Sequence, residues 1–281
     1  MSGRLGTWDD LVAAVPDGTS VGVGGVGLSR KPMHAVLELA RAARRDLDLV
    51  TFVGGLEVEV LLAADALRSV TSSSVSLGLH GRARRFSEAV ADEAVEDREM
   101  SEWMLVGGLR AAAMGVPFLP TRAAIGSDLV AARDLRRIVD PYSGESFLAV
   151  PALHPDVAII QAWRADASGN VQVPWPPDHL WDVDVVLARA SRTTIVCAEE
   201  IVPAAAIAAD SHLTRLFSFE VDLVVPAAGG SWPRRSRPCA SKTDRGYMRT
   251  PRIRAVRSSK HPVHMSSIRA PTTRSADEEQ R

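Results

Sequence analysis

The chain has 281 residues, with 33 Lys and Arg against 34 Asp and Glu and a formal net charge of −1. This balance gives no indication of a nucleic-acid or membrane-surface partner. Two cysteines, Cys197 and Cys239, exclude a disulfide framework and fit a reducing compartment, so we expect a cytoplasmic protein. The sequence shows no apolar run of 18 residues and no N-terminal apolar stretch of signal-peptide length, so we expect neither a membrane span nor a leader.

The charge is divided unevenly along the chain. Residues 1–230 carry 20 basic and 30 acidic side chains, a net of −10, whereas residues 231–281 carry 13 basic and 4 acidic, a net of +9. Thirty of the 33 basic residues are Arg, and Lys31 is the only lysine before residue 242. We therefore expect an acidic folded domain over 1–230 and a separate basic tail over 231–281.

The domain alternates predicted helices and strands, which indicates a mostly parallel α/β sheet flanked by helices. Thr7, Ser29 and Ser101 are predicted N-caps of the helices that follow them, and Pro32 falls in the first turn after Ser29. Thr7 followed by Asp10 resembles a capping box. Helices are expected at 8–15, 30–40, 57–67, 84–91, 102–114 and 181–190. Strands are expected at 20–23, 47–53, 75–79, 147–150, 157–160, 171–173, 194–197 and 221–225.

A glycine-rich segment, Gly-Val-Gly-Gly-Val-Gly at 22–27, lies between a predicted strand and a predicted helix. It matches the G-x-G-x-x-G of dinucleotide-binding loops. That interpretation needs an acidic residue at the end of the second strand, but Asp46 and Asp48 lie at its beginning, which disfavours a nicotinamide-dependent dehydrogenase. Two interpretations remain. One is a site for an anionic group, to which Arg30 and Lys31 add two cations. The other is a tight turn whose basic residues face solvent.

Residues 17–32 resemble the N-terminal signature of family I coenzyme A transferase subunits. That signature is an aspartate/glycine turn, an apolar strand, Gly-Gly, an aromatic, a short spacer and a proline. Val26 stands in place of the aromatic and Arg30 where many members have glycine, while Arg-Lys-Pro at 30–32 is the form of glutaconate CoA-transferase-like α subunits. The resemblance spans about 7–230 and implies the CoA-transferase fold. It continues in order through 115–120, 149–160, 167–171, 197–201 and 221–226.

The resemblance implies transfer of coenzyme A between carboxylic acids by a glutamate that attacks the acyl-CoA thioester. In the family a β subunit usually supplies it within Ser-Glu-Asn-Gly, which this sequence lacks. We therefore expect an α subunit that shares its site with a β-like partner. Its substrates would be an acyl-CoA and a free carboxylic acid, and no cofactor would be permanently bound. The expected contacts with substrate or coenzyme A are Gly24, Gly25, Gly27, Ser29, Arg30, Lys31 and Glu199.

Glu102 is the candidate catalytic residue within this chain. It falls in the first turn of a predicted helix, where the helix dipole favours a carboxylate, although an acid there can simply stabilise the helix. Residues 98–102 resemble the α subunit of a bacterial hydrolase that opens a CoA-linked steroid ring, which implies a catalytic glutamate, but Trp103 replaces a small residue. Two alternatives to transfer therefore stay open: hydrolysis that depends on Glu102, and a non-catalytic partner subunit.

The remaining candidates carry weaker signals. Glu199 and Glu200 follow a strand directly, where the ligand crevices of α/β proteins lie. Ser127 lacks the flanking Gly-x-Ser-x-Gly of a hydrolase elbow, so we expect it in a turn. The histidines are dispersed without ligand spacing, and no metal site is expected.

From Ser231 the periodic pattern stops. Residues 231–281 contain 8 Ser and 5 Pro with scattered apolar residues, which is typical of a disordered tail. A nucleic-acid-binding arm is disfavoured because Trp232 and Tyr247 are its only aromatic residues. Out-of-frame reading of GC-rich DNA also yields such Arg/Ser/Pro-rich sequence, so a frameshift after about Pro233 is a further hypothesis, which resequencing the gene would test.

Overall fold

The structure is a computed structural model that describes residues 4–174, 177 and 179–232. The strands of its large sheet are β1 (Arg4–Leu5), β2 (Ser20–Val26), β3 (Leu47–Val53), β4 (Leu67–Ser72), β5 (Glu96–Glu99), β9 (Val157–Ala165), β10 (Val171–Gln172), β11 (Thr193–Ile201), β12 (Thr214–Leu216) and β13 (Leu223–Pro226). A smaller sheet contains β6 (Phe118–Thr121), β7 (Arg136–Val139) and β8 (Ser146–Pro151). The helices are α1 (Trp8–Ala13), α2 (Met33–Arg41), α3 (Leu56–Ala63), α4 (Arg84–Ala91), α5 (Glu102–Ala113), α6 (Leu129–Ala132), α7 (Trp181–Ala190) and α8 (Ala204–Ala209).

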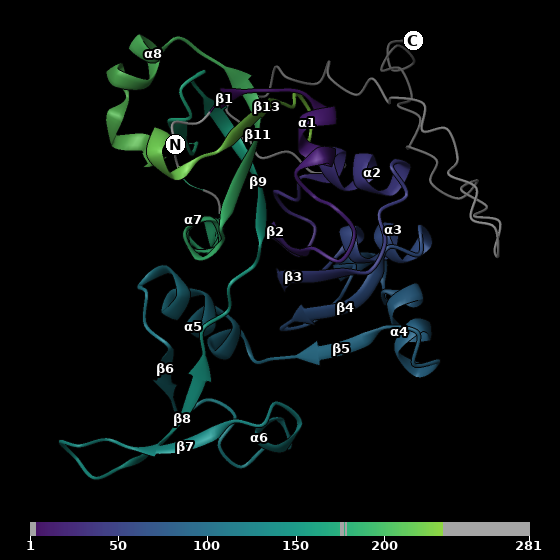
Figure 1. The fold of residues 1–281 in the computed structure, drawn as a ribbon, viewed down its shortest axis with the longest axis vertical. Helices are drawn as coiled ribbons and strands as arrows, with labels where there is room; N and C mark the ends of the chain where they lie inside the picture. The colour runs from purple at the N-terminus through teal and green to yellow at the C-terminus, as the bar shows by residue number, and fades with distance from the viewer. Residues whose placement is uncertain (1–3, 175–176, 178, 233–281) are drawn as a thin grey trace, which may run out of the picture.

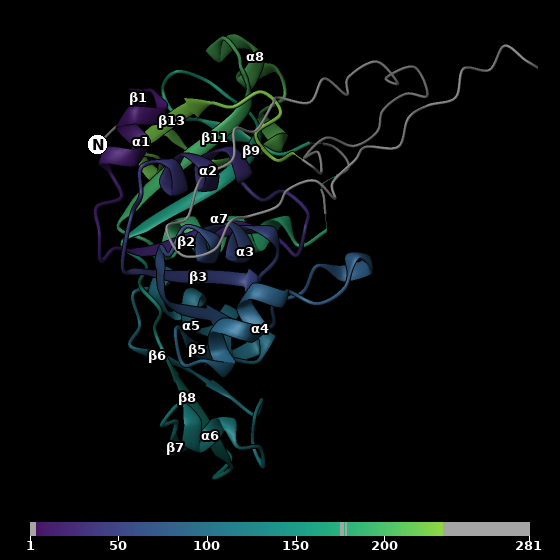
Figure 2. The same cartoon turned by 90° about the vertical axis from the view of Figure 1, so that its right-hand side faces the viewer.

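The large sheet has the strand order β1-β13-β11-β9-β2-β3-β4-β5, and every neighbouring pair along this path is parallel. β10 pairs antiparallel with β9 and with β12. The small sheet, in the order β6-β8-β7, is antiparallel and extends from one end of the molecule (Figure 1, Figure 2). The predicted fold class, a mostly parallel sheet flanked by helices, is confirmed.

Helices cover both faces of the large sheet because its strands present apolar side chains to both faces. Helices α1–α4 cover one face and α5 and α7 the other (Figure 1). On β2, Val21 and Val23 face the α1–α4 layer, whereas Gly22 faces α7. A Cβ at Gly22 would lie 2.6 Å from Leu187 Cδ1, so this glycine lets α7 pack directly on the strand.

Several predicted elements are confirmed with their bounds. The strand over 47–53 and the helices over 84–91 and 181–190 begin and end where expected. Thr7 caps α1 in a capping box with Asp10, and the Ser101 hydroxyl accepts the Met104 N–H of α5 at 3.3 Å. Thr7 and Ser101 therefore fix the residues at which α1 and α5 begin.

The predicted cap at Ser29 is wrong. α2 begins at Met33, and no side chain caps it. The Ser29 backbone is instead paired with Val26, which keeps Ser29 in a turn that precedes the helix.

The interpretation of residues 57–79 is also wrong in part. α3 ends at Ala63, and the strand that follows is β4, whereas the predicted strand at 75–79 contains only isolated bridges at Val75 and Ser76 and the start of a 3₁₀ turn. The mostly apolar stretch at residues 60–67, interrupted by Asp65, fits helix and strand equally well by period, so the pattern could not locate the boundary.

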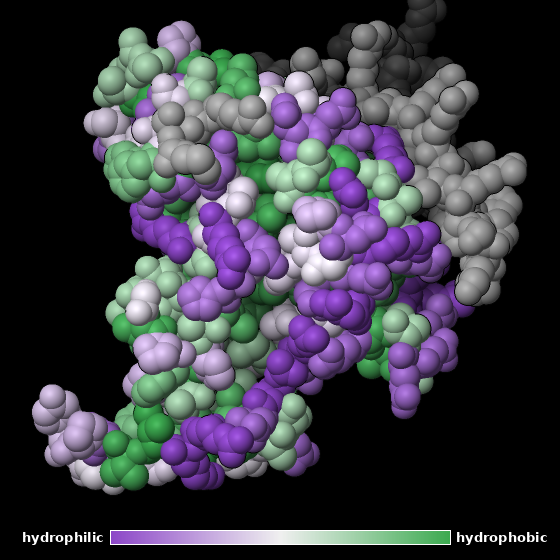
Figure 3. Space-filling model, viewed as in Figure 1, coloured by the Kyte–Doolittle hydropathy of each residue, from purple (hydrophilic) through white to green (hydrophobic). Residues whose placement is uncertain are grey.

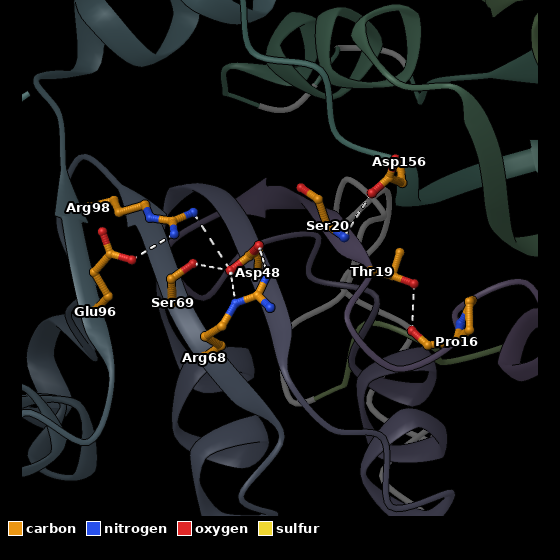
Figure 4. Close-up of polar contacts among 9 residues, drawn as sticks. All are labelled: Pro16, Thr19, Ser20, Asp48, Arg68, Ser69, Glu96, Arg98 and Asp156. Carbon is orange, nitrogen blue, oxygen red and sulfur yellow. Dashed lines mark hydrogen bonds and ion pairs between the residues drawn. The ribbon is translucent and has the colours of Figure 1, made fainter.

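A polar network ties β3, β4 and β5 together near their amino ends (Figure 4). Asp48 accepts hydrogen bonds from Ser69, at 2.5 Å, and from Arg68, and it lies 3.7 Å from Arg98, which also pairs with Glu96. The acid at the beginning of β3 is therefore a structural residue. It lies at the amino-end edge of the sheet, whereas the glycine-rich segment leads to the carboxyl-end edge, which also disfavours a dinucleotide site.

Apolar side chains are exposed on α5 and the small sheet. Figure 3 shows this side greener than the side of α2–α4. The large exposed residues here include Trp103, Met114, Phe118 and Val139.

Within the described residues, no helix is both long enough and apolar enough to cross a bilayer. The predicted tail, apart from Ser231 and Trp232, lies outside the described residues, so its boundary and the frameshift hypothesis remain predictions.

Candidate functional site

The carboxyl ends of the parallel strands form the edge of the sheet at which most of the predicted site residues lie. The glycine-rich segment ends β2, Glu102 follows β5, and Glu199 lies near the end of β11. Ligands of open α/β sheets bind outside this edge. β2 and β5 are three strand spacings apart, roughly 14 Å, so the glycines and Glu102 form two separate parts of one edge.

The glycine-rich segment ends in a tight hairpin turn. The N–H of Val26 donates to the Ser29 carbonyl and the N–H of Ser29 donates to the Val26 carbonyl, both at 2.9 Å. Gly27, with φ of 55°, occupies the first of two central positions, as a type II′ turn requires. We call residues 26–29 the edge turn; Gly27 is partly exposed, whereas Gly24 and Gly25 are buried.

Gly25 fixes the approach to the edge turn. Its φ is +82°, and a Cβ there would lie 2.5 Å from the Ser29 carbonyl oxygen. Its N–H donates to Asp184 Oδ1 at 2.7 Å. No other residue fits this position without moving the turn.

Arg30, which follows the edge turn, is buried with 4% of its surface exposed. Its Nε lies 3.2 Å from Asp184 Oδ2, Nη1 donates to the His179 carbonyl at 2.8 Å and Nη2 to the Leu180 carbonyl at 3.1 Å. The guanidinium is therefore bound to the N-terminal end of α7.

Lys31 is more deeply buried, at 1% exposure. Its Nζ lies 2.7 Å from Glu57 Oε1 of α3 and donates to Thr51 Oγ1 of β3 at 2.6 Å. Glu57 also accepts the Gly55 N–H at 3.1 Å. The interpretation of Arg30 and Lys31 as solvent-facing is wrong, because both cations are paired with carboxylates inside the chain.

Glu102 lies in the first turn of α5, as predicted, and its side chain is exposed. Among the described residues, none makes a hydrogen bond or ion pair with its carboxylate, and the neighbouring Trp103 is 69% exposed. A ligand or a partner chain can therefore reach this carboxylate.

Glu199 is half-buried and holds the turn that follows β13. It accepts hydrogen bonds from Gln161 Nε2 at 3.1 Å, the Gly229 N–H at 2.7 Å and the Ser231 hydroxyl at 3.4 Å. Glu200 is half-buried on the same strand. The sequence does not predict this role, because residues 229–231 follow Glu199 by about 30 positions.

Asp184 and Glu57 are the site residues that sequence reasoning missed. Each is an acid on a helix face that packs inward, with 5% and 0% exposure. For Asp184, the helical spacing indicates burial. It precedes Leu187 and Ala188 by three and four residues, so it lies on the same buried face of α7. An acid there needs a buried cation, and Arg30 supplies it.

Two smaller expectations concern Ser127 and metal binding. Ser127 lies in a turn, where its hydroxyl donates to the Ala124 carbonyl at 2.8 Å, as expected. Over residues 4–174, 177 and 179–232, no three His, Cys, Asp or Glu side chains are placed to hold a metal ion.

The architecture is that of an α/β protein whose predicted site residues lie at the carboxyl ends of parallel strands. The family model for coenzyme A transferase matches residues 6–220, and the chain belongs to that family. The resemblance seen in the sequence is confirmed.

Named relatives differ in their activities. The IpdA subunit of the cholesterol ring-cleaving hydrolase of Mycobacterium tuberculosis is 33% identical, over 79% of this chain and 78% of its own. The A subunit of the 3-oxoadipate CoA-transferase of Pseudomonas knackmussii is 32% identical, over 77% and 76%. A protein of Archaeoglobus fulgidus is 35% identical, and this chain spans 48% of its length.

Solved structures show the same fold. Glutaconate CoA-transferase of Acidaminococcus fermentans aligns with a TM-score of 0.76 and 28% identity, over 83% of this chain and 78% of its own. The decarboxylase AibA/AibB, solved as a cysteine-to-serine variant, aligns with a TM-score of 0.75 and 31% identity, over 84% and 87%. Relatives with the same fold thus have different named reactions, so the fold alone does not identify the reaction of this chain.

Proposed function

We propose that the chain is the α subunit of a heteromeric enzyme that transfers coenzyme A between carboxylic acids, at a site completed by a β-like partner. The observation that carries this proposal is the similarity to the A subunit of the 3-oxoadipate CoA-transferase, which is 32% identical and extends over about three quarters of both chains. The partly exposed edge turn at the carboxyl ends of the strands supports it, because ligands bind at this edge in parallel sheets.

In this proposal the predicted substrate contacts have different roles. Gly27 and Ser29 contact the substrate, because they belong to the edge turn itself. Gly24 and Gly25 shape the strand beneath, and Arg30 and Lys31 act through the backbone of the edge turn. Glu199 acts through the turn at residues 229–231.

The partner supplies the nucleophile, since this chain lacks Ser-Glu-Asn-Gly. Its glutamate attacks the thioester carbonyl and expels the CoA thiolate, which leaves an acyl-glutamyl anhydride. The thiolate then attacks the glutamyl carbonyl of the anhydride and releases the first acid. The second acid attacks the glutamyl-CoA thioester and expels the CoA thiolate, which forms a new anhydride. The thiolate then attacks the acyl carbonyl of that anhydride, which releases the second acid as its CoA thioester and regenerates the glutamate. No other reactant is consumed.

Hydrolysis that depends on Glu102 is the second candidate. Two observations favour it: the 33% identity to the IpdA subunit, and the exposed carboxylate of Glu102 at the start of α5. In this case Glu102 would act on a water or on the substrate directly, and loss of its charge would abolish the reaction.

The test is co-expression with a β-like CoA-transferase subunit, followed by three assays of the purified complex: CoA exchange between acids, hydrolysis of a CoA-linked ring or thioester, and CO₂ release. Each assay is repeated with Glu102→Gln and with Glu88→Gln, an exposed acid of α4, as the control.

Exchange that survives Glu102→Gln supports the transferase. Hydrolysis that falls by about 100-fold or more in Glu102→Gln, but not in Glu88→Gln, supports the second candidate. Activity of the partner alone, at the rate of the complex, would overturn both and indicate a non-catalytic subunit. CO₂ release without exchange would overturn both in favour of decarboxylation.

A further inference from the structure

We infer that Asp184 and Glu57 are positioning residues, which hold the edge turn from the two opposite faces of the sheet through buried ion pairs with Arg30 and Lys31. The effect that we expect on kcat rests on the proposed function, whereas the effect that we expect on hydrogen exchange in the edge turn does not.

The two cations are adjacent in sequence but belong to different layers. Arg30 reaches Asp184 of α7, in the layer of α5 and α7. Lys31 reaches Glu57 of α3, in the layer of α1–α4. Two consecutive residues after the edge turn therefore bind helices on opposite faces of the sheet.

Asp184 joins the two ends of the edge turn. Its Oδ1 accepts the N–H of Gly25, which precedes the turn, and its Oδ2 pairs with Nε of Arg30, which follows it. One carboxylate therefore sets the distance between residues 25 and 30. Because it is 5% exposed, solvent screens these contacts little.

Arg30 has a backbone conformation that its side chain must maintain. Its φ is 55°, in the left-handed region that non-glycine residues rarely occupy. Such conformations persist where surrounding contacts hold them, and here all three guanidinium nitrogens are hydrogen-bonded. Glycine adopts this φ without strain, so Arg30→Gly removes the side-chain contacts without straining the backbone.

The second ion pair fixes the surface against which the turn rests. Glu57 binds Lys31 and also accepts the Gly55 N–H, while the Gly27 N–H of the turn donates to the Val53 carbonyl at 2.9 Å. A Cβ at Gly55 would lie 2.4 Å from the Gly27 carbonyl oxygen, so residues 53–55 are in direct contact with the turn.

A positioning role separates from a stabilising one because replacing both partners with neutral residues removes the cost of burying two charges together with their mutual attraction. In the double variant Lys31→Met/Glu57→Gln we expect a melting temperature close to that of the wild type. We nevertheless expect faster hydrogen exchange in the edge turn, because the geometric constraint is lost.

The experiment is hydrogen exchange with mass spectrometry on the full chain, for Asp184→Asn, Arg30→Gly and Lys31→Met/Glu57→Gln. Peptides over 26–31 should exchange about 10-fold faster or more than in the wild type, while peptides of β11 do not change. The matched control is Asp48→Asn, a carboxylate that pairs with arginines at the amino-end edge; it should leave 26–31 unchanged.

Unchanged exchange over 26–31 in Arg30→Gly and in the double variant would overturn the inference. An increase spread equally over β11 would also overturn it, because it would mark a general loss of stability. Should Asp184→Asn not fold, these two variants carry the test.

In the complex with its partner, the same variants should lower kcat by about 10- to 100-fold, with KM changed far less, because the substrate still binds but is misaligned. Faster turn exchange with unchanged kcat and KM would overturn the kinetic part. A wild-type complex without activity on CoA thioesters would overturn the proposed function and leave the exchange result standing.

Discussion

At the scale of single residues, the glycines of the 22–27 segment have different functions. Gly22 lets α7 pack directly on β2. Gly25 adopts a positive φ where a Cβ would collide with the Ser29 carbonyl oxygen, and Gly27 occupies the first central position of the edge turn. A Cβ at Gly24 would lie 3.0 Å from Ile160 Cγ2, so the three glycines at the G-x-G-x-x-G positions, Gly22, Gly24 and Gly27, reflect close packing and turn geometry in this chain.

We expect Gly25→Ala to destabilise the protein by at least about 2 kcal/mol, because a Cβ meets backbone and φ is positive. Gly107→Ala on α5 is the control: nothing lies within 4 Å of its Cβ position, and alanine is the better helix former. Urea unfolding of both variants measures the difference. Equal effects would contradict the assigned geometry.

We expect Cys197 to be unreactive in the folded protein. Burial raises the pKa of its thiol to about 12, so hardly any thiolate exists near neutral pH. Iodoacetamide should modify Cys197 only after unfolding, as peptide mass spectrometry can show separately from Cys239. Modification under native conditions would contradict the burial.

At the scale of elements, helix α7 and the hydrogen-bonded ends of the strands decide the geometry of the site. α7 packs on the glycine face of β2 and carries Asp184 to the edge turn. A change in the α7–β2 distance therefore reaches the site through Asp184.

We expect Gly22→Ala to cost about 1–3 kcal/mol of unfolding free energy, because its methyl group would overlap Leu187. Leu187→Ala should also destabilise, but the double variant should be less destabilised than the sum of the two. A double-mutant cycle by denaturant unfolding tests this; strict additivity would contradict direct contact.

The polar network near the amino ends predicts a pH dependence. Partial burial raises the pKa of Asp48, but hydrogen bonds from Arg68 and Ser69 and the charge of Arg98 outweigh it, so the pKa lies below its usual 3.8. A carboxyl with a depressed folded pKa stabilises the fold above its unfolded pKa, and this contribution is lost as pH falls through the folded pKa.

Asp48→Asn should therefore lower stability at neutral pH by roughly 1–2 kcal/mol, and the difference from the wild type should shrink below about pH 4. Melting temperatures of both proteins from acidic to neutral pH measure this. A difference that stays constant with pH would contradict an ionised Asp48 as the cause.

At the scale of the whole molecule, the sequence predicts the class of fold better than it predicts the site. The strand over 47–53 and the helix over 181–190 have unbroken patterns and lie where expected. β5 reads Glu-Asp-Arg-Glu at a sheet edge and has no apolar alternation from which to predict it. The pairing of Arg30 with Asp184 joins residues 154 positions apart, which local patterns cannot show.

The division of the chain at about residue 230 is a whole-molecule prediction. Because residues 231–281 have no periodic apolar pattern, we expect a variant that ends after Trp232 to unfold cooperatively, within about 2 °C of the full chain. Thermal unfolding followed by circular dichroism tests this. A large loss of melting temperature would show that the basic segment is part of the fold.

The opposite directions of Arg30 and Lys31 also constrain how this segment can change in length during evolution. An insertion between Gly27 and Leu28 would lengthen the tip of the turn and leave both ion pairs in place. An insertion between Arg30 and Lys31 would move Lys31 away from its carboxylate and leave two buried charges without partners. We therefore expect natural length variation at the tip, and a fixed number of residues from Ser29 to the start of α2.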